Sequence, residues 1–238
     1  MFLNPVLGAA LDRITERAAD VRRAFIPGGA AQHDDVASPA ATSDFTLDPL
    51  SVSADAGLYF VTRDPHGRIG FSADGSFALR NGRLEDRDGN AVCGRDGSGD
   101  FVELRLDPVD EALGRTANVR IEADGAFAYD RSSVDPRSGI RDTRRVVAGH
   151  LAIARFPAGT RLAEEDGRRF PPRDVAPQLG SAGHDGFAAL APMHRTRSGV
   201  ELDESLIRLK EAYLTFDALQ AAETAKGHLG KTAMDLLK

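Results

Sequence analysis

Apolar and polar residues alternate in short runs through the middle of the chain. Residues 49–94 contain four apolar runs, separated by the Gly-containing turns Pro65-His66-Gly67, Asp74-Gly75, Asn81-Gly82 and Asp88-Gly89. Asn, Asp and Gly tolerate the positive φ angles that tight hairpins require. Within the runs, apolar residues recur at every second position, as at Tyr59 and Val61. This period is typical of half-buried strands, so the segment predicts a compact β-meander.

The same alternation continues further along the chain. Residues 100–106 and 117–122 predict strands, residues 144–156 predict one longer strand, and residues 157–192 are rich in turn residues. Ala73-Asp-Gly-Ser-Phe-Ala78 is echoed by Ala123-Asp-Gly-Ala-Phe-Ala128, which predicts two hairpins of the same type. Two copies are too few for a solenoid, which needs at least about three repeats.

Both ends of the chain have helical periodicity. Apolar residues step by three and four at each end, at Leu7, Leu11, Ile14, Ala18, Val21 and Phe25 and at Leu202, Leu206, Leu209, Tyr213 and Phe216. Such spacing places an apolar seam on one helix face, as in a coiled coil. Each seam alone also suits a terminal helix that packs on its own β-domain. Together, at opposite ends of a β-rich chain, the seams predict helices that pair with each other and with neighbouring subunits.

These patterns predict an α+β fold that is mainly β. We expect an N-terminal helix over residues 1–26, a linker rich in Gly, Ala, Ser, Asp and Pro over 27–48, a β-rich domain of hairpins over 49–195, and a C-terminal helix over 196–238. The two helices are expected to pair in a coiled-coil-like bundle.

Composition narrows the functional classes. The 238 residues are 42% hydrophobic and 28% charged, as in ordinary globular proteins. A formal net charge of −6 argues against a general nucleic-acid binder, which needs a concentrated basic surface. The single cysteine, Cys93, is expected to be a small, semi-buried strand residue.

We expect no membrane insertion, because no stretch approaches the roughly 18 apolar residues of a membrane-spanning helix. The first residues lack a basic region, and Asp12-Arg13 interrupts the apolar run early, so we expect no cleaved secretory signal.

The sequence contains little that points to a catalytic, cofactor or metal site. Asp86-Arg-Asp88-Gly-Asn90 resembles a calcium loop superficially, but the spacing of an EF-hand is incomplete, and a hairpin turn is the preferred interpretation. His150, His184 and His194 lack the spacing of usual zinc sites. There is no P-loop, Gly-x-Gly-x-x-Gly or Gly-x-Ser-x-Gly motif. The sequence therefore predicts no enzyme, no cofactor and no metal.

The order of motifs over residues 49–94 resembles the flagellar basal-body rod and hook proteins. The motifs are Pro-Leu-x-Val, Gly-x-x-Phe-Val, Phe-x-x-Asp-Gly-x-Phe-x-Leu, Gly-x-Leu and Asp-Gly-x-x-Val-x-Gly. The matching residues are Pro49, Leu50, Val52, Gly57, Phe60, Val61, Asp74, Gly75, Phe77, Leu79, Gly82, Leu84, Gly89, Val92 and Gly94. Weaker similarity extends over 118–156 and 198–216.

This resemblance implies a structural subunit of the rod. In that family the two terminal helices form the inner layer of a tube, which makes the seam residues of both helices the expected assembly interface. The implied partners are other copies of the chain, other rod and hook proteins and the flagellar type III export machinery. The implied location is the basal body in the periplasm, reached without a cleaved signal. We expect Leu209→Asp to abolish assembly and to leave the β-domain folded.

The chain departs from the family in two segments. The Asn-rich motif that usually follows the first helix is replaced by Ala19-Asp-Val-Arg-Arg-Ala-Phe-Ile-Pro-Gly-Gly29. The usual Ser-Asn-Val before the last helix is Ser198-Gly199-Val200. The interpretation is therefore a divergent rod-type subunit. The alternatives are a non-flagellar, extracytoplasmic β-rich binding module with helical flanks, or an enzyme whose histidines converge on a metal.

Overall fold

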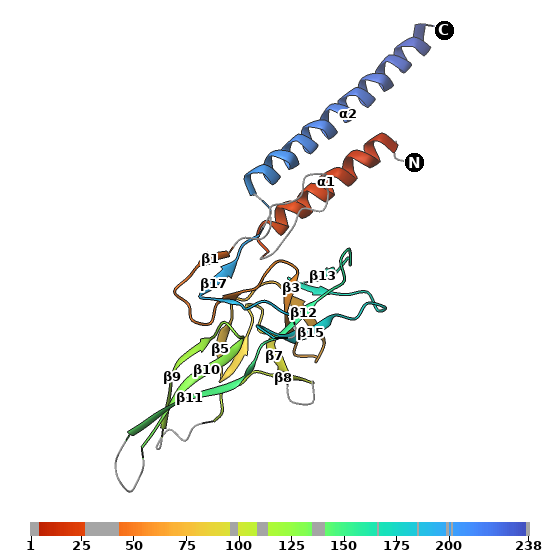
Figure 1. The fold of residues 1–238 in the computed structure, drawn as a ribbon. Coiled ribbons are helices and arrows are strands. Elements are labelled where there is room, and N and C mark those ends of the chain that lie inside the picture. Colours follow the sequence, from red (N-terminus) through yellow and green to blue (C-terminus); the bar gives the residue numbers. More distant parts are fainter. Residues whose placement is uncertain are drawn as a thin grey trace. The chain divides into compact units, whose positions relative to one another are not determined.

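The chain folds into many short strands with one helix near each end. The computed structural model describes residues 5–26, 43–95, 100–108, 114–134, 141–165, 167–184, 186–198, 200 and 202–236. Helix α1 spans Pro5–Arg23 and helix α2 spans Leu202–Leu236 (Figure 1). The predicted fold class, mainly β with terminal helices, is confirmed.

The chain divides into two compact units. The helical unit comprises Met1–Ala41 and Ser198–Lys238, and the β unit comprises Thr42–Arg197. These bounds lie close to the predicted limits of the β-rich domain.

The β unit is built around one large antiparallel sheet. Its main path runs β13 (Ala163–Glu165), β14 (Arg168–Phe170), β4 (Ile69–Ser72), β3 (Leu58–Arg63), β7 (Ala91–Arg95), β6 (Arg83–Glu85) and β5 (Ala78–Arg80). Strand β12 (Ala152–Arg155) pairs with both β3 and β15 (Gln178–Ser181), and β8 (Phe101–Glu103) pairs with β7.

Three smaller sheets complete the unit. Strands β9 (Gly114–Ile121), β10 (Ala126–Val134) and β11 (Arg141–His150) form an antiparallel sheet with β10 in the centre. Strand β2 (Val52–Ser53) pairs with β16 (Ala191–Pro192). Strand β1 (Ser43–Phe45) pairs with β17 (His194–Thr196), which brings the two ends of the unit together.

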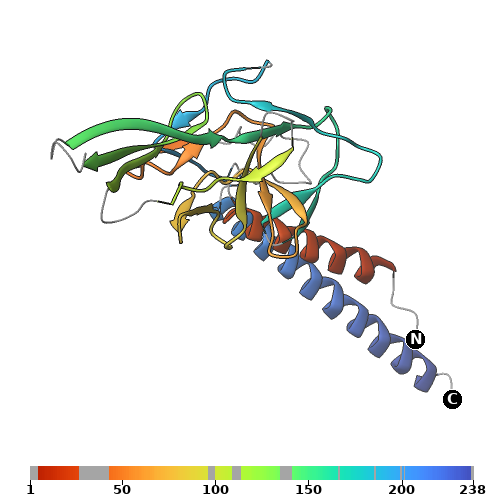
Figure 2. The ribbon, with the colours of Figure 1, turned by 90° about the horizontal axis from the view of Figure 1, so that it is seen from below.

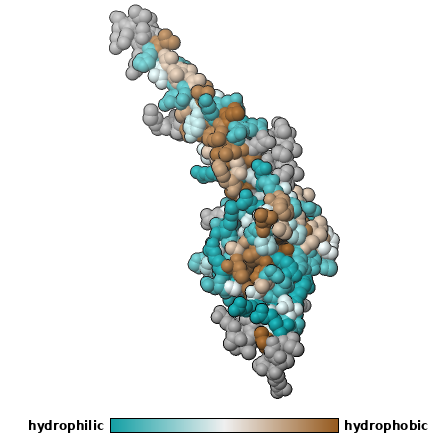
Figure 3. All heavy atoms as spheres, turned by 90° about the vertical axis from the view of Figure 1, so that its left-hand side faces the viewer, coloured by the Kyte–Doolittle hydropathy of each residue, from teal (hydrophilic) through white to brown (hydrophobic). Residues whose placement is uncertain are grey.

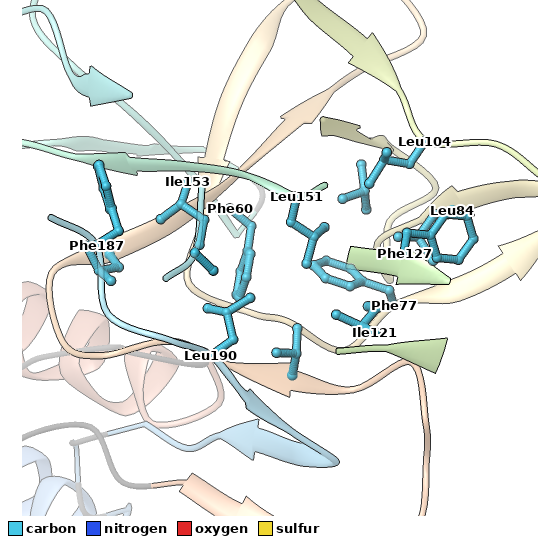
Figure 4. Close-up of a cluster of buried hydrophobic side chains, with 14 residues drawn as sticks. Phe60, Phe77, Leu84, Leu104, Ile121, Phe127, Leu151, Ile153, Phe187 and Leu190 are labelled. Carbon is cyan, nitrogen blue, oxygen red and sulfur yellow. The ribbon is translucent and has the colours of Figure 1, made fainter. Parts of the chain in front are cut away.

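The core of the β unit consists of two apolar clusters. The larger one gathers Phe60, Phe77, Leu84, Leu104, Phe127, Leu151 and Ile153, among others (Figure 4). The smaller one contains Val61, Phe71, Cys93, Ala152 and Ala154. Phe60 and Val61 are neighbours on β3 and enter different clusters, because successive strand residues point to opposite faces. The sheet is therefore buried on both sides at β3.

Two predictions about the strands are wrong, one in its bounds and one in its pairing. The single strand predicted over 144–156 is divided at Leu151, because β11 and β12 belong to different sheets. The predicted hairpin around Asp74-Gly75 does not form, since β4 pairs with β3 and β14 whereas β5 pairs with β6. The segment after β4 crosses residues 51–52 instead, through the bridge between Ser51 and Ser76. A local pattern does not reveal such a distant partner.

The predicted linker is shorter than expected at its C-terminal end. Residues 27–42 lie outside the described residues, but Ser43–Phe45 forms β1. Its partner, His194–Thr196, is remote in sequence, so the local composition did not indicate a strand.

Candidate assembly surface

The helical unit consists of two antiparallel helices in contact (Figures 1 and 2). Pro5 begins α1, where its missing N–H costs no helical hydrogen bond. Arg22 and Arg23 occupy the last turn of α1, and Asp203 and Glu204 occupy the first turn of α2. Both pairs have the sign of charge that the helix dipole favours at that end.

A few small residues and several charged ones line the groove between the helices. The groove has a volume of about 590 Å³, and Ala10 of α1 and Ala212 of α2 lie in it. Charged residues complete its lining, among them Arg13 and Glu16 of α1 and Glu211 of α2. Small side chains let two helix backbones approach closely.

The predicted seam residues fall into three classes of exposure. Ile14 is buried, and Leu7, Ala18, Val21, Leu202, Leu209 and Phe216 are partly buried. The remaining four are exposed, and they are Leu11, Phe25, Leu206 and Tyr213. Leu206 and Tyr213 retain 46% and 50% of their accessible surface, whereas Ser205 next to Leu206 is buried. The side of α2 that is covered is therefore rotated by about one residue from the predicted seam.

This rotation leaves an uncovered apolar strip on α2. Leu206, Ile207, Tyr213 and Leu214 are all exposed and are spaced so that they share one side of the helix. We call these four residues the outer strip. Hydrophobic residues are visible on the surface of the helices in Figure 3. The predicted seam did not include Ile207 and Leu214, although they are seven residues apart and lie beside it.

Ser198 links the two helices. Its Oγ donates a hydrogen bond to the Arg23 carbonyl at 2.8 Å and accepts one from the Val200 N–H at 3.0 Å. One hydroxyl thus fastens the end of α1 to the segment that leads into α2. Asp20 lies on α1, three residues before Arg23, and is buried. Its carboxylate forms ion pairs with Arg23 at 3.0 Å and with Arg17 at 3.6 Å. In the sequence, Ser198 stands out only through its place in a motif that resembles the family, and no pattern points to Asp20.

The family-motif residues of the β unit lie at turns and in the core. Phe60 and Phe77 form an edge-to-face pair with ring centroids 5.3 Å apart. Asp74 Oδ1 accepts a hydrogen bond from the Ser76 N–H at 2.9 Å. Asn81 and Gly82 both have positive φ, as the turn between β5 and β6 requires. Among the other motif glycines, Gly57 and Gly89 have positive φ. At Gly75 and Gly94, a Cβ would lie within 3 Å of a backbone atom of another segment.

The candidate catalytic and metal-binding residues do not converge. In the described part of the chain, no three His, Cys, Asp or Glu residues are placed to hold a metal ion. His194 lies on β17, with its Nδ1 2.8 Å from the Pro192 carbonyl. Asp86 closes the turn before β7, where Oδ1 accepts the N–H groups of Asp88 and Asn90. Burial raises the pKa of the Cys93 thiol to about 11, so this thiol is not activated as a nucleophile.

No family model matches this chain, and no curated protein is significantly similar to it. Within the described residues, neither helix has the length and hydropathy needed to cross a bilayer.

Proposed function

We propose that this protein is a structural subunit of the bacterial flagellar basal-body rod. It would assemble helically with other copies of itself and with other rod and hook proteins. It would have no substrate. Export through the flagellar type III machinery would bring it to the basal body in the periplasm without a cleaved signal.

The outer strip is the observation that carries the proposal. A helix in a monomeric protein normally covers its apolar side, and a contiguous exposed apolar patch usually indicates an interaction site. Leu206, Ile207, Tyr213 and Leu214 are 46 to 59% exposed, although they belong to one side of one helix. A second helical pair that covers them would extend the contact between α1 and α2 into a coiled-coil-like bundle. Repetition of such a non-closing contact produces a filament or a tube.

The layout of the chain supports the same function. The motif residues of 49–94 lie in a β unit whose two ends meet at β1 and β17. Both connections to the helices therefore leave the β unit at neighbouring points. This arrangement suits a subunit that presents a helical pair from a separate β-domain.

A polar hollow in the β unit favours the alternative, an extracytoplasmic binding module. It has a volume of about 330 Å³ and is lined by Arg80, Arg87 and Arg195, among others. Ser76 also lines it, and among the described residues its buried Oγ has no hydrogen-bond partner. A small ligand that accepts hydrogen bonds would satisfy this group.

The first experiment is sedimentation velocity of the full-length protein at increasing concentration. We expect large or filamentous species from the unmodified chain. The test variant is Leu206→Asp, which places a charge in the outer strip. It should raise the concentration needed for assembly at least about tenfold, because burying an unpaired carboxylate is costly.

The matched control is Leu47→Asp in the β unit. Leu47 is 83% exposed, so this variant adds the same charge to an apolar surface position outside the helices. It should assemble like the unmodified chain. If the unmodified chain stays monomeric at every concentration, or if both variants assemble normally, the rod proposal fails and the binding-module alternative takes its place.

A further inference from the structure

Strands β9, β10 and β11 form an arm with a free edge. Strand β10 is the central strand, and among the described residues β11 pairs with no strand other than β10 (Figure 1). Residues 141–145 of β11 are all exposed. The outer edge of β11 therefore offers main-chain N–H and C=O groups to a further strand.

The arginines of the arm differ in their partners. Arg120 binds Glu122 and Asp130, and Arg145 also binds Glu122, with its Nε 3.1 Å from Oε1. Arg141 and Arg144 form no ion pair with any described residue. Two guanidinium groups on the free edge thus remain available to an external carboxylate.

The register of β11 defines how a partner strand would meet these groups. Arg141 and Val147 are an even number of residues apart and lie on one face, whereas Arg144 lies on the other face. Val147 is exposed and apolar. In an antiparallel strand beside β11, an acidic residue would lie opposite Arg141. A second acidic residue, three positions earlier in that strand, would lie opposite Arg144, and an apolar residue three positions before that would lie opposite Val147.

We propose that the free edge of β11 binds an extended acidic segment of a partner protein by strand addition. The main chain of the segment would pair with β11, and its carboxylates would reach Arg141 and Arg144. This surface belongs to the β unit and is independent of the rod proposal and of the outer strip.

Charge argues against a second copy of the same edge as the partner. Residues 141–145 hold three arginines and one acidic residue, Asp142, so two β11 edges in contact would bring an excess of like charges together, which is destabilising on adjacent strands. The aromatic residues argue against single-stranded nucleic acid. Phe127 and Tyr129 on β10 are the aromatic residues described in the arm, and both are fully buried, so neither offers a ring on which a base can stack.

Fluorescence anisotropy with a labelled peptide tests the proposal on the full-length protein. The probe is Val-Thr-Thr-Glu-Thr-Thr-Glu, which matches the antiparallel register. We expect saturable binding. The double variant Arg141→Glu/Arg144→Glu should weaken binding at least about tenfold, because both ion pairs become repulsive. The matched control, Arg115→Glu, changes an exposed arginine on β9 at the opposite edge and should alter affinity less than about twofold.

Two further probes separate strand addition from simple charge attraction. A peptide of the same sequence with alternate main-chain nitrogens methylated keeps both carboxylates but cannot complete the ladder, so we expect it to lose binding. Equal affinity for this peptide would overturn strand addition. Tighter binding of a single-stranded oligonucleotide of equal length would overturn the protein partner, and equal weakening by Arg115→Glu would overturn the choice of edge.

Discussion

At the scale of single residues, Gly75 shows that the structural reason for a glycine can differ from the one that the sequence suggests. Asp74-Gly75 reads as a turn that needs positive φ, but Gly75 is not among the glycines with positive φ. Its carbonyl accepts a hydrogen bond from the Val52 N–H at 2.9 Å, and a Cβ at Gly75 would lie 1.9 Å from the Val52 carbonyl oxygen. The close approach of two backbone segments is therefore what excludes a side chain.

We predict that Gly75→Ala lowers the free energy of unfolding by at least about 3 kcal/mol. Neither backbone segment can move aside without breaking the hydrogen bond between the Val52 N–H and the Gly75 carbonyl. The control is Gly57→Ala, whose Cβ meets nothing within 4 Å but whose φ is +82°. It should cost only about 1 kcal/mol, the lower end of the usual strain for positive φ. Urea denaturation followed by circular dichroism measures both. Equal costs would show that close approach is not the cause.

At the scale of elements, one carboxylate connects the outer strands of the arm. Glu122 follows β9 and pairs with Arg120 of β9 and Arg145 of β11, so it joins the two outer strands. The hydrogen bond from Arg145 is the main cause that lowers the pKa of Glu122 below its ordinary value. The ion pairs of Arg120 add Asp130 of β10 to the same group.

The lowered pKa of Glu122 predicts a pH dependence. The unfolded chain binds the Glu122 proton at a higher pH than the folded chain does, so this contribution to stability is present above the unfolded pKa of about 4.3. It is lost as the pH falls through the lower, folded value. We expect Glu122→Gln to flatten the dependence of unfolding free energy on pH below about pH 5. At neutral pH it should cost no more than about 1 kcal/mol, as for other exposed pairs.

Urea unfolding at a series of pH values measures this effect. Glu164→Gln is the matched control, because Glu164 lies exposed on β13 and forms no ion pair with any described residue. The control should keep the slope of the unmodified protein. An unchanged slope in Glu122→Gln would contradict the role given to this carboxylate.

At the scale of the whole molecule, the two units differ in how much apolar surface they bury. Both core clusters lie in the β unit. Of the helical unit, the described buried apolar residues are Ala10, Ile14 and Val200. Isolated helices gain most of their stability from packing, so the helical unit should be the less stable one in a monomer.

We therefore predict two unfolding transitions for the monomeric protein. The helical signal in far-ultraviolet circular dichroism should be lost at a lower temperature than the packing of the β unit. Tyrosine fluorescence of Tyr213→Phe follows the second transition, because the chain has no Trp and three Tyr, of which Tyr59 and Tyr129 remain in the β unit. A single transition seen by both probes would contradict separate units.

Much of the fold could be predicted from the sequence because its signals are local. The two helices follow from three- and four-residue apolar steps, and the strands around Tyr59 and Phe71 follow from alternation between Gly-containing turns. For the candidate assembly surface, periodicity gave the apolar side of each helix. It did not show which of these residues the neighbouring helix covers and which, such as Leu206 and Tyr213, stay exposed.

The sequence by itself determined the terminal helices, several strands of the β unit and the turn at Asn81-Gly82, since these depend on neighbours within a few residues. Only the tertiary structure decided which distant segments pair, such as β1 with β17, and why Gly75 must be a glycine. It also decided that α2 leaves the outer strip uncovered and that β11 has a free edge. These features depend on which surfaces meet across the fold, and residues remote in sequence determine that.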